Sequence, residues 1–315
     1  MSDTKSKLLK IPIVKHVVVF LSKIKLPGLG GLSFYDLFEL YIIGIVKGAL
    51  TTRASAIAFS FFMALFPFLL FVLVIIPYIP IDDFQTDFLA FLESFLPPQT
   101  SDFFHEKIFD NIKSSGLISS VFLISIFLMA NGINAVFSGF ESSYNEQLKR
   151  HFLRQYGYAL MVAVILSFLL LFTVAVLGYF EISVIDRSAD ALQNLGFEKE
   201  DSVGFLADAS KYLFFVMMIY VATATLYYFG TPVRKVSKFR SVGALFSTLL
   251  IMLSSYLFGI YINNFSQYNE LYGSIGALLI LMVYLWLNSN IILLGYELNS
   301  TLRKLKRINK KSDES

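Results

Sequence analysis

The chain has 315 residues, of which 56% are hydrophobic and only 16% are charged, with a formal net charge of +3. Soluble domains carry about 25% charged residues, so this composition excludes an ordinary soluble protein and indicates an integral membrane protein. Apolar runs of about twenty residues favour membrane-spanning helices over the short alternating strands of a membrane barrel. The absence of cysteine excludes disulfide bonds and thiolate metal sites.

Residues 1–50 are predicted to form basic helices at the membrane interface. Residues 6–24 combine lysines with apolar residues, a composition that suits anionic lipid head groups at the cytoplasmic face. Residues 33–50 begin with Ser33-x-x-Asp36, which resembles a capping box. Because Asp36 and Glu39 would be costly inside hydrocarbon, we expect this amphipathic helix to lie in the inner interface rather than to span the membrane.

Six segments that follow are long and apolar enough to span a bilayer. We place the spans at residues 54–80, 116–140, 156–180, 212–230, 242–264 and 272–299. They define an all-α, polytopic bundle of six transmembrane helices over residues 51–302, followed by a basic polar tail over residues 303–315. Most lysines and arginines lie before the first span, after the second and fourth spans, and in the tail. The positive-inside rule therefore places both termini in the cytoplasm.

The first span contains Pro67 well inside its apolar run, preceded by alanines and serines that allow close helix packing. Proline lacks the backbone donor and frees the carbonyl group of Met63 one turn earlier. Two interpretations stay open at this point: a broken helix that lines a cavity, or a kink that serves packing.

Amides occur inside the second and sixth spans, where hydrocarbon penalises unpaired polar groups. Asn131 and Asn134 lie three residues apart on one helical face. They could contact a polar substrate group or bond a neighbouring helix, and we favour the bond between helices. Asn288 and Asn290 point to different faces of their helix, so they cannot both line one cavity.

Glu297 lies about two turns from Asn288, toward the cytoplasmic end of the sixth span. It could pair with an arginine, and Arg53 at the inner end of the first span is a candidate partner. We favour a structural ion pair. The alternative is a titrating carboxylate that couples protons to transport.

No enzyme signature occurs in the sequence. The three histidines are isolated, no HExxH motif is present, and neither a phosphate-binding loop nor a GxSxG motif occurs. We therefore expect no enzyme, no metal site and no cofactor, and we expect no nucleic-acid partner.

Three stretches resemble a known family. They are residues 54–67 (ASAIAFSFFMALFP), residues 232–255 with Ser241-Val-Gly243-Ala, and the sixth span with YGSIGA and LLGYELN. Together they are similar to the YihY/BrkB family of bacterial inner-membrane proteins, over about residues 34–302. The chain departs from the family pattern because the fifth span lacks a tryptophan after its Gly-Ala, and its single tryptophan is Trp286.

The resemblance implies a six-span bundle in the bacterial cytoplasmic membrane. An older family label, ribonuclease BN, is regarded as a misassignment, and some members are described as transporters with a suggested link to lipid export. The resemblance supplies no substrate-binding residues.

We therefore expect a transporter of a lipid or amphipathic solute, with a cavity near Pro67 and polar groups at Asn131, Asn134, Asn288, Asn290 and Glu297. The alternative is a non-transporting membrane scaffold or envelope-assembly factor. A continuous polar cavity that reaches Asn288 would favour transport, and a dry, fully packed bundle would favour the scaffold.

Overall fold

The computed structural model describes residues 12–25, 33–47, 49–75, 115–143, 150–180, 201–231, 239–264 and 274–313. Within these ranges the regular structure is helical, apart from an isolated β-bridge between Lys25 and Ser33. The helices are α2 (Pro12–Lys23), α3 (Phe34–Lys47), α4 (Leu50–Ile75), α7 (Ser115–Glu141), α8 (Phe152–Phe180), α10 (Asp201–Gly230), α11 (Val242–Asn264) and α13 (Ser274–Asp313).

Six of these helices, from α4 onward, are long and apolar enough to cross a membrane. The prediction of an all-α protein with six membrane spans is therefore confirmed. Helix α11 covers the predicted residues, whereas α4 and α8 begin at Leu50 and Phe152, four residues before the predicted starts. Helix α10 begins at Asp201 rather than at residue 212, because a helix can continue past the edge of the hydrocarbon. Residues 76–80, at the predicted end of the first span, lie outside the described residues.

Helix α13 is longer than a membrane span. It has 40 residues, which at a rise of 1.5 Å per residue extend over about 60 Å, whereas the hydrocarbon core is about 30 Å thick. The residues after the predicted span therefore continue as helix through the basic segment up to Asp313. This extension carries six basic residues: Arg303, Lys304, Lys306, Arg307, Lys310 and Lys311.

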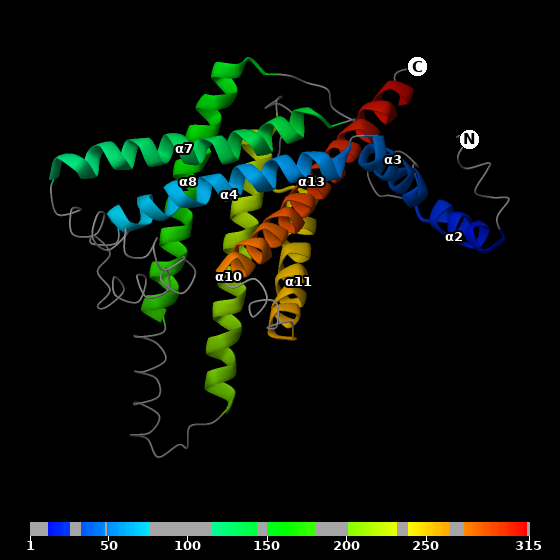
Figure 1. Cartoon of the computed structure of the whole chain (residues 1–315). Helices are drawn as coiled ribbons and strands as arrows, with labels where there is room; N and C mark the ends of the chain where they lie inside the picture. Colours follow the sequence, from blue (N-terminus) through cyan, green and yellow to red (C-terminus); the bar gives the residue numbers. More distant parts are fainter. Residues whose placement is uncertain are drawn as a thin grey trace.

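The helices form two groups that cross steeply (Figure 1). Helices α4 and α7 run side by side in opposite directions, and α8, α10 and α11 run together in a second direction. Helix α13 passes obliquely between the groups and contacts both α4 and α11. Helix α3 packs on α13 and α2 packs on α3, so these two short helices form an arm near the C-terminal end of α13 (Figure 1).

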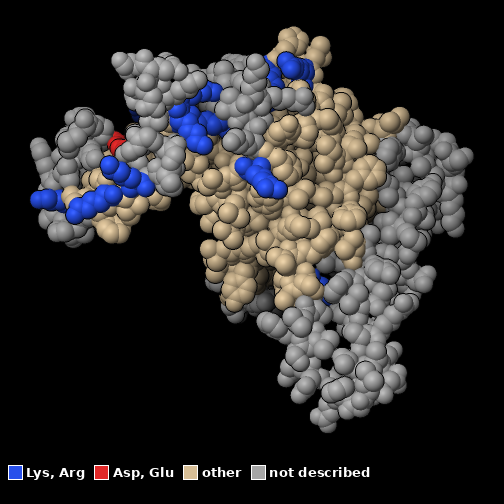
Figure 2. Space-filling view, turned by 180° about the vertical axis from the view of Figure 1, so that it is seen from behind, with Lys and Arg blue, Asp and Glu red and all other residues tan. Residues whose placement is uncertain are grey.

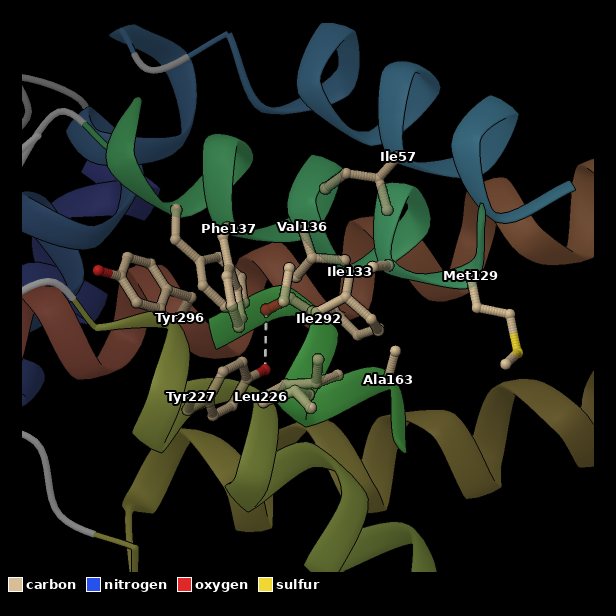
Figure 3. Close-up of a cluster of buried hydrophobic side chains, with 14 of the residues drawn as sticks. Ile57, Met129, Ile133, Val136, Phe137, Ala163, Leu226, Tyr227, Ile292 and Tyr296 are labelled. Atoms are coloured by element: carbon tan, nitrogen blue, oxygen red, sulfur yellow. Dashed lines mark hydrogen bonds between the residues drawn. The ribbon is translucent and has the colours of Figure 1, made fainter. Parts of the chain in front are cut away.

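The two groups meet in a core built mainly from α4, α7, α8, α10 and α13 (Figure 3). Ile57 of α4, Val136 and Phe137 of α7 and Tyr296 of α13 are each no more than 1% exposed. In the same core, the ring of Tyr296 stacks on that of Phe140 with centroids 4.1 Å apart. The apolar faces of helices that are distant in sequence are therefore buried together in the centre of the bundle.

The start of α3 has the predicted capping box. The amide of Ser33 donates to Oδ2 of Asp36 at 2.8 Å, and the amide of Asp36 donates to Oγ of Ser33 at 3.3 Å. These bonds satisfy two backbone donors that a helix start leaves without partners. They fix the point at which the chain turns from α2 into α3.

Candidate functional site

A buried ion pair joins the first and last spans. Nη2 of Arg53 on α4 lies 2.8 Å from Oε1 of Glu297 on α13, and the two side chains are 9% and 0% exposed. Nη1 of Arg53 donates to the carbonyl oxygen of Gly139 at 2.8 Å, and Oγ of Ser143 donates to Oε2 of Glu297 at 2.8 Å. The pair that the sequence offered as a candidate is thus present, and it also engages the end of α7.

These contacts compensate both charges. A buried unpaired charge is very costly, and a buried ion pair is tolerated when further hydrogen bonds satisfy its remaining atoms. Here each oxygen of Glu297 has a partner, and the guanidinium of Arg53 has one charged and one neutral acceptor, while its buried Nε has no hydrogen-bond partner among the described residues. The contacts link α4, α7 and α13, and the structural role that we favoured from the sequence stays a prediction.

Tyr41 of α3 lies against this pair. Its hydroxyl donates to the carbonyl oxygen of Leu294 at 3.3 Å. Burial, and to a lesser degree the negative charge of Glu297, raise the pKa of Tyr41 well above its usual value. A tyrosine hydroxyl is already protonated at neutral pH, and the raised pKa keeps it a donor at alkaline pH as well, so this bond links α3 to the last span.

A second polar cluster surrounds Arg150, before the start of α8. Its guanidinium donates to the carbonyl oxygen of Phe229 at 2.6 Å and to that of Thr231, and it lies over the ring of Tyr158 at 5.0 Å. The backbone amide of Arg150 donates to Oε1 of Glu141 at 2.9 Å. Burial lowers the pKa of Arg150, and the charge of Glu141 offsets part of this effect. Arg150 thus caps the C-terminal end of α10, whose last carbonyl groups have no partner within the helix.

The sequence offered no signal for this cap. Arg150 and the carbonyl groups that it contacts are separated by about eighty residues in the chain. A positive charge at a helix C-terminus is favourable, but the sequence does not indicate which helix end a distant arginine reaches.

Two of the three stretches that carry the family resemblance meet between α11 and α13. Oδ1 of Asn299 accepts from the amide of Gly243 at 2.8 Å, and its Nδ2 donates to Oγ of Ser241 at 3.1 Å. A Cβ atom placed on Gly243 would lie 2.1 Å from the carbonyl oxygen of Gly295, so the two backbones are in direct contact. Small residues permit such close approach of membrane helices. The motif residues therefore form a helix junction.

Tyr227 of α10 completes this junction. Its hydroxyl donates to the carbonyl oxygen of Ile292 at 2.8 Å (Figure 3) and lies 2.6 Å from Oγ of Ser247. Ser247 in turn donates to the carbonyl oxygen of Ile291 at 3.1 Å. The last three spans are thus linked by hydroxyl groups that donate to backbone carbonyls of α13.

The four asparagines do not converge on one point. Oδ1 of Asn131 accepts from the hydroxyl of Tyr156 at 3.1 Å, and Oδ1 of Asn134 lies 3.0 Å from Nε2 of Gln155, so both amides bridge α7 and α8. Asn288 and Asn290 each donate to a carbonyl group one turn earlier in their own helix, at 2.9 Å and 2.8 Å. Asn288 keeps a buried Oδ1 atom without a hydrogen-bond partner among the described residues.

The molecule also has an apolar cavity of about 270 Å³ between α4, α7, α8 and α13, and this cavity is open to the surface of the bundle. Its lining includes Phe61, Phe68, Met129, Leu170 and Leu285, and one polar side chain, Ser167, whose hydroxyl donates to the carbonyl of Ala163 at 2.8 Å. Pro67 is buried beside Phe68, and α4 continues as a helix through it, which favours the packing interpretation.

The cavity differs from both sequence-based expectations. None of the polar candidates Asn131, Asn134, Asn288, Asn290 and Glu297 lines it, so it is not the expected polar cavity. The bundle is not fully packed either. An apolar lining gives no signal in a membrane sequence, because apolar residues also face lipid.

Comparison with known proteins gives a family match and curated relatives. The family model described as Virulence factor BrkB matches residues 44–315. The ribonuclease-like protein YfkH of Bacillus subtilis (strain 168) is 27% identical over 82% of this chain and 91% of its own length. A UPF0761 membrane protein of Coxiella burnetii is 25% identical over 77% of this chain and 84% of its own length. A UPF0761 membrane protein of Psychrobacter sp. (strain PRwf-1) is 24% identical over 86% of this chain, but the match spans only 50% of that relative. No solved structure matches the chain.

Proposed function

The chain belongs to the BrkB family of multi-pass bacterial membrane proteins, and we propose that it takes up a lipid or amphipathic solute and moves it across the cytoplasmic membrane. The apolar cavity carries this proposal. Its lining residues Phe61, Met129, Ser167 and Leu285 lie inside four different candidate spans, so the cavity is at the depth of the lipid tails.

The size and chemistry of the cavity favour an acyl chain or a similar apolar tail. Ligand pockets usually enclose about 300–1,000 Å³, and the cavity, at about 270 Å³, lies just below that range. It would accept one tail and leave a polar head group outside. The buried ion pair of Arg53 and Glu297 lines no part of the cavity, so in this proposal it holds the spans in place.

The proposal is tested with purified protein in liposomes that contain a fluorescent phospholipid, whose movement between leaflets is followed by chemical quenching. Leu170 lines the cavity and is 44% exposed, so Leu170→Trp should obstruct the cavity from its rim. We expect about a tenfold slower movement, which corresponds to an increase of about 1.4 kcal/mol in the activation free energy of transport.

Ile165→Trp is the matched control, because Ile165 is exposed on the same helix but lies outside the cavity lining. Lipid movement that is equal in both variants would remove the cavity from the mechanism. Glu297→Gln and Asn288→Ala test whether these two polar residues take part in transport. If the loss of transport in each variant merely matched its loss of folded protein, both residues would have a structural role.

A non-transporting membrane scaffold is the second candidate. The observation that favours it is the use of polar groups within the spans, since Asn131, Asn134 and Glu297 each contact a neighbouring helix. A scaffold would leave the labelled lipid in place in liposomes and would co-purify with other envelope proteins in mild detergent.

We also propose that the chain is not an enzyme. Among the described residues there is no group of three His, Cys, Asp or Glu side chains that could hold a metal ion. The ribonuclease-like name belongs to the Bacillus subtilis relative. Incubation of the purified chain with labelled RNA should leave the RNA intact, and cleavage that co-purifies with the chain would contradict the proposal.

A further inference from the structure

We propose that the arm formed by α2 and α3 is a docking surface for an anionic phospholipid membrane. The first observation is its position. Helix α3 ends at Lys47 and the first candidate span begins at Leu50, so the arm is tethered directly to the point where the chain enters the membrane. Ala49 between them has φ of +47°, in the left-handed region that makes a sharp turn.

The second observation is a set of apolar side chains that the fold leaves uncovered. On α3, Phe34, Phe38, Ile42 and Val46 recur every four residues and are 41%, 49%, 40% and 74% exposed. Residues at this spacing form one stripe along a helix. The adjoining side of α3 packs on α13, where Tyr41 donates to the carbonyl group of Leu294. Helix α3 therefore has one apolar side that packs on protein and another that is free.

The third observation is the chemistry of α2. Val18 is buried, at 3% exposed, whereas Phe20 is 65% exposed and Ile24 is 41% exposed. Lys15, Lys23 and Lys25 are all exposed on the same segment. Figure 2 shows lysines and arginines over the arm and over the adjoining upper part of the molecule, with few on the lower described surface.

Exposed apolar and basic side chains on short interfacial helices match the surface of an anionic leaflet. The apolar side chains can enter the boundary between head groups and acyl chains, while lysines remain at the level of the phosphate groups. A soluble acidic protein could neutralise the charge of the lysines. It would not explain the exposed apolar side chains beside the point where α4 enters the membrane. Charge and position together identify the partner as phosphatidylglycerol-like lipid of the membrane in which the chain resides.

The absence of cysteine from the chain allows a direct test. Full-length Phe20→Cys protein is labelled with an environment-sensitive fluorophore and reconstituted into phosphatidylcholine, or into an equal mixture of phosphatidylcholine and phosphatidylglycerol. We expect a blue shift of the emission and stronger quenching by nitroxide-labelled lipid in the anionic mixture, both weakened by salt.

Replacing Lys15, Lys23 and Lys25 by glutamine in the labelled protein should abolish the difference between the two lipid mixtures. The matched control is Phe59→Cys, because Phe59 is 55% exposed within the first candidate span and should be surrounded by lipid in both mixtures. The proposal is overturned if the label at position 20 reports the same environment in both mixtures. It is equally overturned if the lysine replacements leave the difference unchanged while the position-59 label confirms insertion.

Discussion

Arg53 and Glu297 are separated by 244 positions in the chain, yet their charged atoms are 2.8 Å apart in an almost fully buried setting. A buried pair of this kind contributes little compared with a well-packed apolar pair, but removal of one partner leaves an uncompensated charge. The residues that complete the site, Ser143 and Gly139, contribute a hydroxyl and a carbonyl group. At the scale of the residue, the ion pair links α4 to α13. Removal of one partner should therefore lower the stability of the protein.

Arg53→Ala is expected to lower the free energy of unfolding by about 3–5 kcal/mol, because Glu297 would lose its charged partner. The measurement is the thermal unfolding midpoint of the purified protein in detergent. The double variant Arg53→Met/Glu297→Leu should lose less stability than the summed losses of its two single variants, Arg53→Met and Glu297→Leu. Arg240→Ala is the control, since Arg240 is exposed and its loss should change stability by no more than about 0.5 kcal/mol. Strictly additive effects of the two substitutions would show that the residues are not coupled.

At the scale of the element, the junction of α11 and α13 depends on the absence of side chains. Gly243 and Gly295 let the two backbones touch, and the side chain of Asn299 bonds the amide of Gly243 across the contact. Helices in lipid gain little from apolar burial against one another, so close packing and hydrogen bonds between helices decide which faces meet. The close contact of the two helices at this junction rests on those two glycines.

Gly243→Ala should destabilise the protein by about 1–3 kcal/mol, the usual cost of overpacking, because its methyl group would lie 2.1 Å from the carbonyl oxygen of Gly295. Gly259→Ala on the same helix is the matched control, since a Cβ atom there meets nothing within 4 Å. The control should be neutral or stabilising by up to about 1 kcal/mol, as expected from helix propensity. Equal responses of the two variants, measured by thermal unfolding in detergent, would contradict the close contact.

At the scale of the whole molecule, six spans and the basic segments together predict the orientation. Lys and Arg lie over the arm of α2 and α3 and on the adjoining part of the molecule (Figure 2), and the extended end of α13 is also basic. The positive-inside rule places this side in the cytoplasm. The orientation remains a prediction that accessibility measurements can decide.

Two single-cysteine variants test the orientation. Asp201→Cys is at the first residue of α10 and should react with a membrane-impermeant maleimide added to intact spheroplasts. Ser142→Cys follows the end of α7, where the native side chain is exposed, and should react only after the membrane is permeabilised. The reverse labelling pattern would show that the chain has the opposite orientation in the membrane.

The sequence alone determined the class of the protein, its six spans and its family resemblance, because apolar length and loop charge are local properties that a bilayer selects directly. It also gave the capping box of Ser33 and Asp36, whose partners are three residues apart. Among the polar residues, it could name Arg53 and Glu297 as one candidate pair, but it had no signal for Ser143 or for the cap by Arg150.

Only the tertiary structure decided which helix faces meet. Lipid tails and protein interiors are both apolar, so the sequence of a membrane span gives little indication of its rotation about its own axis. For this reason the asparagines that appeared to be one group are dispersed, two between α7 and α8 and two bonded within α13. For the same reason the cavity formed by α4, α7, α8 and α13 became visible only once the helices were packed together.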